Sequence, residues 1–176
     1  MYKIINKDYT NTIDRDEIKE VGNITSTTDD KIIQRLGKVA TDYIENLTNK
    51  DISINDYSYH IYDFDGDSIR VNKSNYISVS AITKKDGSSV TGYTVKEYLN
   101  YFLIELEESV TDDEITVYFR VGYSAKNDIP TNFLQAICVT AIDLYDRPSS
   151  VTLSNIKFDE SLVKNLIKSE KKMIVY

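Results

Sequence analysis

Carboxylates gathered in two short runs are the side chains of this sequence best suited to chemistry. In the first run, Asp63, Asp65 and Asp67 alternate around Gly66. A calcium-binding EF-hand loop has glycine at its sixth position and glutamate at its twelfth, but counting from Asp63 places glycine fourth and Ser74 twelfth. The run therefore does not match a calcium loop, and short carboxylates beside a glycine favour a hairpin turn.

A divalent-metal site for phosphodiester chemistry is an alternative use of these carboxylates. Alternation along a strand would place Glu105 and Glu107 of the second run on one face. Together with Asp63, Asp65 and Asp67 they would make a metal-dependent phosphodiesterase or nuclease. Because 28 of the 176 residues are acidic, neighbouring carboxylates also arise by chance, and a solvated face is the simpler interpretation.

Nucleophilic and histidine-centred catalysis have little support in the sequence. The single histidine, His60, has no nucleophile-elbow motif nearby, which is typical of a surface or packing residue. Cys138, the one cysteine, lies on an apolar stripe, so we expect a buried side chain and no internal disulfide. No phosphate-binding loop or dinucleotide-binding motif is present. We expect no catalytic residue, no metal and no cofactor, and therefore no enzyme.

Charge and hydropathy exclude further classes of function. The chain carries 21 basic and 28 acidic side chains, a formal net charge of −7, and only 5 of its basic residues are arginine. Gripping nucleic acid requires clustered positive charge, so we expect no specific DNA binding. No stretch approaches the roughly 18 apolar residues that span a bilayer, and the first residues lack the pattern of a signal peptide. We expect no membrane partner and synthesis in a reducing cytoplasm.

Apolar residues at steps of three and four predict two helices in the first third of the chain. A short helix opens at Asp14, with Glu17 at the spacing of a capping box. A long amphipathic helix spans about 28–48, with Thr28 as its N-cap and Asn49 as its end.

Two more helices are predicted in the last third. A largely buried helix spans about 130–146, with Pro130 in its first turn and Arg147-Pro148 at its end. A short C-terminal helix follows a polar linker and contains four apolar residues, Leu162, Val163, Leu166 and Ile167.

From about 57 to 122 the apolar period changes to two, which predicts an antiparallel sheet or a set of hairpins. Turns between its strands are predicted at three dipeptides, Asp65-Gly66, Asp86-Gly87 and Asp112-Asp113. The fold class is therefore α+β, a small helical bundle with an attached sheet. We expect one domain over 1–176 that ends in an apolar tail at about 172–176.

The apolar tail, Met173-Ile174-Val175-Tyr176, is β-prone and follows a lysine-rich run. One interpretation is that it folds back onto its own domain. The other is that it adds as a strand to the exposed sheet edge of a partner.

In this order the elements resemble the head–tail connector (adaptor) family of tailed double-stranded DNA bacteriophages. A final helix after a short linker is part of the likeness. Three stretches carry it: the short acidic helix followed by the long helix that runs from Thr28-Asp29-Asp30-Lys31-Ile32-Ile33 to Tyr43-Ile44-Glu45-Asn46-Leu47-Thr48, the strand 115–121 followed by Gly122-Tyr123, and the helix between Ile129-Pro130 and Leu144-Tyr145-Asp146-Arg147.

The resemblance implies a virion structural protein of the neck, made in the host cytoplasm and without catalytic activity. Such adaptors form a ring, usually of twelve copies, that docks under the portal protein and leads to the tail or a stopper protein. Genome DNA passes through the ring without specific binding. Another neck protein, such as a stopper or tail-completion protein, is an alternative in the same assembly.

Two sets of residues are candidates for contacts in such a ring. Met173, Ile174, Val175 and Tyr176 are candidates for the contact with the portal protein or another partner. Tyr57, Tyr59 and Tyr62 are candidates for contacts between ring subunits, because tyrosine supplies contact area with a polar tip. Ordinary packing within the chain is the alternative for these three tyrosines.

Overall fold

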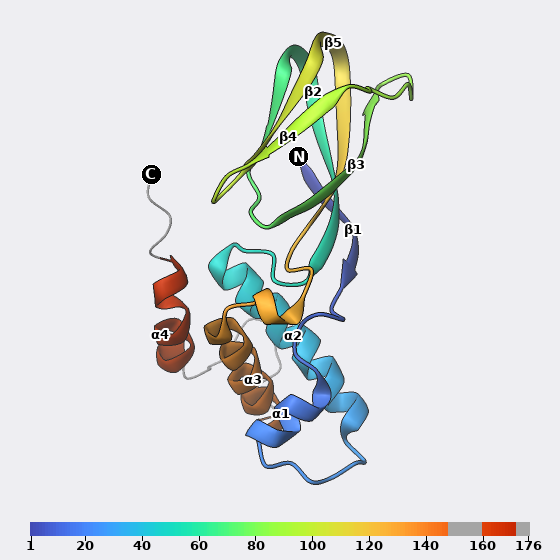
Figure 1. The fold of residues 1–176 in the computed structure, drawn as a ribbon. Coiled ribbons are helices and arrows are strands. Elements are labelled where there is room, and N and C mark those ends of the chain that lie inside the picture. The colour runs from blue at the N-terminus through green and yellow to red at the C-terminus, as the bar shows by residue number, and fades with distance from the viewer. Residues whose placement is uncertain (148–159, 172–176) are drawn as a thin grey trace. The chain divides into compact units, whose positions relative to one another are not determined.

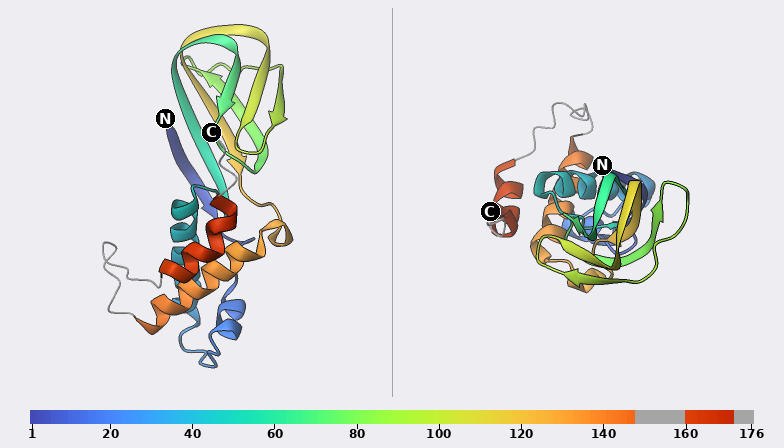
Figure 2. Two further views of the ribbon diagram at one scale, coloured as in Figure 1. Left: turned by 90° about the vertical axis from the view of Figure 1, so that its left-hand side faces the viewer. Right: turned by 90° about the horizontal axis from the view of Figure 1, so that it is seen from above.

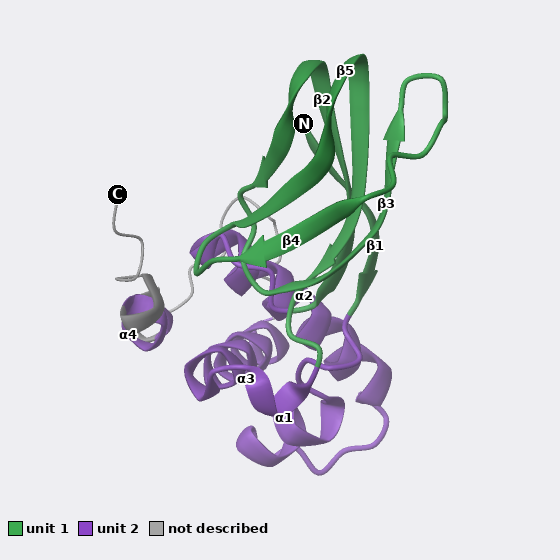
Figure 3. Ribbon diagram, turned by 45° about the horizontal axis from the view of Figure 1, so that its top comes forward, with its two compact units in different colours: residues 1–8, 53–124 green, residues 9–52, 125–176 purple. Residues whose placement is uncertain are grey.

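The computed structural model describes residues 1–147 and 160–171 of the chain. They form two compact units: unit 1 comprises residues 1–8 and 53–124, and unit 2 comprises residues 9–52 and the described residues from 125 onward (Figures 1 and 3). Within these ranges every strand lies in unit 1 and every helix in unit 2, so the predicted α+β class is confirmed. The single connector domain over 1–176 stays a prediction. None of the described helices is long and apolar enough to cross a membrane.

Unit 2 contains the predicted helices, and all four are confirmed. Their bounds are α1 Arg15–Val21, α2 Asp30–Thr48, α3 Thr131–Asp146 and α4 Glu160–Lys171, with a short 3-10 helix, η1, at Lys126–Asp128. Helix α3 packs against both α2 and α4. The largest buried side chains of these helices are apolar and lie at helical spacing, among them Ile33, Ile44, Phe133 and Ile137.

The helix ends follow local capping, with one error in the prediction. Asp14 and Glu17 form the expected capping box at the start of α1, and Asn49 ends α2 in the left-handed conformation at φ 54°. Thr28, however, is not the N-cap of α2, because the helix begins at Asp30 with Asp29 as its N-cap. The Thr28 hydroxyl instead bonds the Ser26 hydroxyl at 2.7 Å.

Helix α3 is also displaced slightly from its predicted start. Pro130 is the N-cap and not a residue of the first turn, and its carbonyl accepts the backbone N–H of Phe133 at 2.9 Å. Arg147 is the C-cap, as expected from the proline that follows it.

Unit 1 is an antiparallel sheet of five strands built around two long ones. The order is β1-β2-β5-β3, and β4 pairs with another stretch of β5. The bounds are β1 Tyr2–Asp8, β2 Ile54–Val71, β3 Tyr76–Lys84, β4 Tyr93–Glu97 and β5 Phe102–Val121. Since β5 pairs with three other strands, it organises the whole sheet.

Both long strands fold back on themselves. Phe102 and Phe119 lie at opposite ends of β5, and a straight strand would separate them by roughly 56 Å at 3.3 Å per residue. Their ring centroids are only 5.4 Å apart. Strands β2 and β5 turn over together at one end of unit 1 (Figures 1 and 2). The two halves of each strand therefore enclose one apolar core, which contains both phenylalanines.

The bend coincides with a large bulge, and it corrects two of the predicted turns. Pairing jumps from Gly66↔Val110 to Ser68↔Glu105, so residues 106–109 of β5 stand opposite Asp67 alone. Asp65-Gly66 and Asp112-Asp113 are not turns between strands: both dipeptides lie inside the paired β2–β5 ladder. The third predicted turn, Asp86-Gly87, is confirmed, with Gly87 at φ 85°.

Candidate functional site: assembly surfaces

Tyr57, the first of the three candidate ring-contact tyrosines, is a core residue of unit 1. Its side chain is 6% exposed, and its ring stacks on that of Phe119 with centroids 5.4 Å apart. The Lys73 ammonium donates to its hydroxyl at 2.9 Å. Tyr57 therefore packs within its own chain, and little of its surface is accessible to a partner.

The other two tyrosines become progressively more exposed along β2. Tyr59 is partly buried and stacks on Tyr2 with centroids 4.3 Å apart. Tyr2 is itself packed in the unit, and burial raises the pKa of its hydroxyl. Tyr62 is 65% exposed. A ring contact through this segment therefore depends mainly on Tyr62.

The first acidic run lies at the bend of the long strands. Asp65 accepts a hydrogen bond from the Thr111 hydroxyl at 2.7 Å, and Lys85 pairs with Asp113 at 2.8 Å. The ion pair with Lys85 lowers the pKa of the Asp113 carboxyl. These side chains line a shallow hollow with Asp63, Phe64, Asp86 and Asp112.

The second acidic run does not join the first in a metal site. Glu105 pairs with Lys96 at 2.7 Å, and Glu107 lies over Gly92 in another hollow, lined also by Lys84 and Glu108. The described part of the chain contains no group of three or more histidine, cysteine, aspartate or glutamate side chains placed to hold a metal ion. The five carboxylates of the nuclease alternative therefore form no common ligand set.

His60 and Cys138 have ordinary structural surroundings. The His60 Nδ1 lies 2.7 Å from a Glu114 carboxylate oxygen and 3.1 Å from the Thr116 hydroxyl, so the ring bridges β2 and β5. Cys138 is buried in unit 2, and burial raises the pKa of its thiol to about 11. A thiol with that pKa is almost entirely protonated at neutral pH, which makes it a poor nucleophile.

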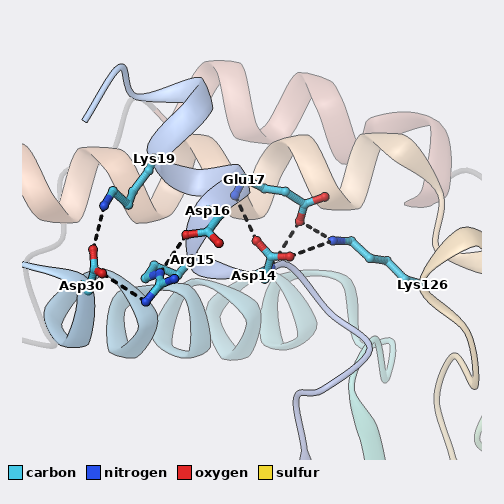
Figure 4. Close-up of polar contacts among 7 residues, drawn as sticks. All are labelled: Asp14, Arg15, Asp16, Glu17, Lys19, Asp30 and Lys126. Carbon is cyan, nitrogen blue, oxygen red and sulfur yellow. Dashed lines mark hydrogen bonds and ion pairs between the residues drawn. The ribbon is translucent and has the colours of Figure 1, made fainter. Parts of the chain in front are cut away.

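A charged network fastens α1 to its neighbours in unit 2 (Figure 4). On one side, Asp30 at the start of α2 forms ion pairs with Lys19 at 2.7 Å and with Arg15 at 3.0 Å. On the other side, Lys126 of η1 pairs with Glu17 and lies 3.8 Å from Asp14. The capping box of α1 is thus also a docking point for the chain that leads into α3.

Helices α1 and α2 also approach each other closely, because the contact residue Gly37 has no side chain. A Cβ built at Gly37 of α2 would lie 2.9 Å from the Cδ1 atom of Ile18 in α1, and Ile18 is 1% exposed. The Tyr145 hydroxyl of α3 donates to the Asp29 carboxylate at 2.9 Å, which uses the carboxylate that could have capped α2. These contacts make α1, α2 and α3 one connected scaffold.

Two exposed apolar surfaces of unit 1 were not predicted from the sequence. One is the turn between β4 and β5, where Leu99 is 64% exposed, and the other is β1, where Ile4 and Ile5 are 48% and 56% exposed. A leucine in a tight hairpin turn, where glycine, asparagine or aspartate is usual, was a signal for the first. The tail candidates Met173, Ile174, Val175 and Tyr176 lie outside the described residues.

Comparison with known proteins gives a likeness of fold. No family model and no curated protein matches the sequence. Among solved structures, a chain of the "neck of empty GTA particle computed with C6 symmetry" is similar at a TM-score of 0.77 and 14% identity, covering 100% of this chain and 97% of that one. A chain of the "neck of native GTA particle computed with C12 symmetry" is similar at 0.73 and 14%, with the same coverage.

A third structure, "virion of native gene transfer agent (GTA) particle", contains a chain similar at a TM-score of 0.70 and 14% identity, covering 94% of each chain. Since the likeness extends over both compact units, the combination of helical unit and sheet unit is a shared architecture. At this identity the comparisons establish the fold.

Proposed function

We propose that this chain is a structural subunit of a virion neck, one copy of an adaptor ring that joins the capsid portal to the tail or to a stopper protein. The observation that carries the proposal is the likeness of fold, over the whole chain, to a chain from the neck of a gene transfer agent particle. The sequence resemblance to phage adaptors rests on other features, the order of helices and the Gly122-Tyr123 exit, and supports the same role.

A ring of twelve copies is the form of assembly we propose. The symmetry of the similar neck structures, C6 in one and C12 in another, supports a closed ring. Such a ring needs a heterologous contact, in which one surface of each subunit fits a different surface of the next. Tyr62 and Tyr59 remain candidates for part of that contact, and Tyr62→Ala should weaken ring formation without unfolding the chain.

Genome DNA would pass through this ring without being bound. Twelve copies with a net charge of −7 each would bring about eighty negative charges to the ring, and those near the lumen would repel phosphates. This acidity supports a channel along which DNA slides.

A structural role without catalysis is part of the proposal. Its support is that the candidate metal ligands Asp65, Glu105 and Glu107 are each engaged by other groups or lie in separate hollows. We expect no rise in melting temperature with added magnesium or manganese, since a ligand stabilises a fold only where it binds. A rise that Asp65→Ala abolishes would favour the nuclease instead.

The proposed contact with the portal protein uses the tail residues Met173 to Tyr176, by addition of a strand. The test is binding of the full chain to isolated portal rings, measured by co-sedimentation. Binding should be lost when these four residues are deleted, and also when they are replaced by four serines, which keeps the length. Unchanged binding by both variants would refute the tail contact, and no binding by the intact chain would count against the adaptor role.

A further inference from the structure

The hairpin that joins β4 to β5 ends in an ordered turn, Tyr98-Leu99-Asn100-Tyr101, which we name the aromatic tip. The backbone N–H of Tyr98 donates to the carbonyl of Tyr101 at 2.9 Å, and the two rings stack with centroids 4.5 Å apart. The Arg70 guanidinium lies 4.0 Å from the centroid of the Tyr101 ring. Contacts inside unit 1 therefore already hold the tip in one conformation.

The aromatic tip presents apolar surface to solvent. Leu99 is 64% exposed and Tyr98 is 43% exposed. Tyrosine and arginine are enriched in protein interfaces, and a surface that is ordered before binding loses little conformational entropy when it binds. The tip thus combines the composition and the rigidity of an interface anchor.

A second exposed apolar surface lies on the edge strand β1. Its register shifts between Ile4, which pairs with Tyr57, and Asn6, which pairs with Asp56, so that Ile5 is the extra residue of a bulge. Ile4 and Ile5 are 48% and 56% exposed. We name these two residues, with the exposed Lys3 before them, the β1 patch.

Each surface has at its margin one exposed residue whose charge is opposite to that of the residue on the other surface, and the tip also carries the positive charge of Arg70. Lys3 belongs to the β1 patch, whereas Glu97 directly precedes the aromatic tip, and both side chains are exposed. Glu107 and Glu108, also exposed, lie farther along the same hairpin on β5. Copies of a chain with a net charge of −7 repel one another at long range, so they associate best where apolar surfaces meet with complementary charge.

We propose that the aromatic tip of one copy packs on the β1 patch of the next copy in the ring, with Leu99 against Ile4 and Ile5 and with Glu97 beside Lys3. This inference rests on the proposed function and names the surfaces through which the copies meet. The tip and the patch are different surfaces of the same unit, so the contact is head-to-tail and repeats until the ring closes.

Disulfide trapping between two variants that each carry one introduced cysteine tests the contact. Ile5→Cys and Leu99→Cys chains, one of them carrying a size tag, are mixed and oxidised at pH 8. The native Cys138 does not interfere, because it is buried with a pKa of about 11. The control replaces Ile5→Cys with Lys85→Cys, whose parent side chain is 61% exposed on the same unit.

The mixed disulfide of Ile5→Cys and Leu99→Cys should form about tenfold faster than that of the control pair, because contact raises the effective concentration of the two thiols. One chain carrying both cysteines should give a ladder of oligomers. Equal rates for the two pairs, including the case in which no pair reacts measurably, would overturn the proposal.

A charge exchange tests the pairing of Glu97 with Lys3. Lys3→Glu in the Ile5→Cys chain should slow trapping about threefold, and Glu97→Lys in the Leu99→Cys chain should restore it. Restoration would not occur if the first substitution had merely disturbed β1, so failure of the rescue would contradict this pair.

Failure of this contact and failure of the adaptor role give different results. If the chain is found at the neck of particles but the trapping rates are equal, only the contact is wrong. If trapping is fast but the chain is absent from the neck, the contact stands and the adaptor role is wrong.

Discussion

The two compact units differ in where they leave apolar side chains. Among the described residues, unit 1 exposes six large apolar side chains and unit 2 exposes two, Val21 and Ile32. The six of unit 1 are Met1, Ile4, Ile5, Tyr62, Tyr98 and Leu99. This difference is the reason why the proposed contacts between copies use the sheet unit.

The units also differ in what holds them together. In unit 2, ion pairs of Asp30 and Lys126 and the close approach at Gly37 join separate helices. In unit 1, the edge-on contact between the Phe102 and Phe119 rings joins the two halves of the folded strand β5. Both units should therefore respond to the loss of a buried ring, and the helical unit should respond in addition to the loss of its caps and of the ion pairs between its helices.

The largest expected effects come from removing one buried ring in each unit. Phe119→Ala in unit 1 and Phe133→Ala in unit 2 each remove a side chain that is at most 2% exposed. Each should lower the free energy of unfolding by about 3–5 kcal/mol. Urea titrations followed by circular dichroism, at wavelengths weighted toward strand or helix, would show which unit each substitution weakens. A loss below about 1 kcal/mol for Phe119→Ala would contradict the folded-strand core.

Gly122 tests the geometry at the end of β5. Its φ is 122°, and a Cβ built there would overlap the carbonyl oxygen of Ser53. Gly122→Ala should lower the free energy of unfolding by about 3 kcal/mol. Gly87→Ala is the control, because φ is 85° there but no atom lies within 4 Å of the added Cβ, so about 1 kcal/mol is expected. Equal losses in thermal unfolding would contradict the close approach to Ser53.

The capping box tests the helical unit more gently. Asp14→Ala removes the side chain that accepts the Glu17 backbone N–H at 3.0 Å, and it should lower the free energy of unfolding by about 1 kcal/mol. Glu20→Ala, on the exposed surface of the same helix, should change it by less than about 0.5 kcal/mol. If both variants melt alike, the cap does not stabilise α1.

The smallest expected effect is a pH dependence in unit 1. Arg120 donates to the Asp56 carboxylate at 2.6 Å and lowers its pKa below the ordinary value. A carboxyl whose pKa is lowered by folding stabilises the fold at pH values above its unfolded-state pKa of about 4. This stabilisation is lost as the pH falls through the folded-state pKa. Asp56→Asn should therefore cost about 0.5 kcal/mol at pH 7, and this cost should shrink as the pH falls below about 4. A cost independent of pH would show that the ion pair is not its source.

The helices were predictable because their signals are local. The capping box at Asp14 and the left-handed end at Asn49 depend on residues within one or two turns. Thr28 is not the N-cap because its hydroxyl bonds Ser26. Asp29 takes the N-cap position, and its carboxylate accepts a hydrogen bond from Tyr145 of α3. A partner 116 positions away in the chain leaves no trace in local spacing.

The sequence predicted an antiparallel sheet, but it did not predict that two long strands fold back on themselves. Asp65-Gly66 is typical of a turn, yet its pairing with Thr111 and Val110 keeps it within a ladder. The bulge beside it turns the strands over and brings Phe102 to Phe119. Register between distant strands decides that outcome, and local composition does not encode it.

The proposed contact residues were also predicted only in part. The alternation of β2 could not tell which tyrosine faces the core, and the structure buries Tyr57 while it exposes Tyr62. The aromatic tip was not predicted because the stacking of Tyr98 on Tyr101 depends on the geometry of the turn between them, which the local pattern does not show.

The most direct test of the adaptor role is electron cryo-microscopy of particles that contain this chain. We predict a ring of its copies under the portal, with side-chain density that fits α2 and α3 of unit 2 and the folded β2 and β5 strands of unit 1. A neck reconstructed to the same detail in which no ring fits this chain would contradict the assignment.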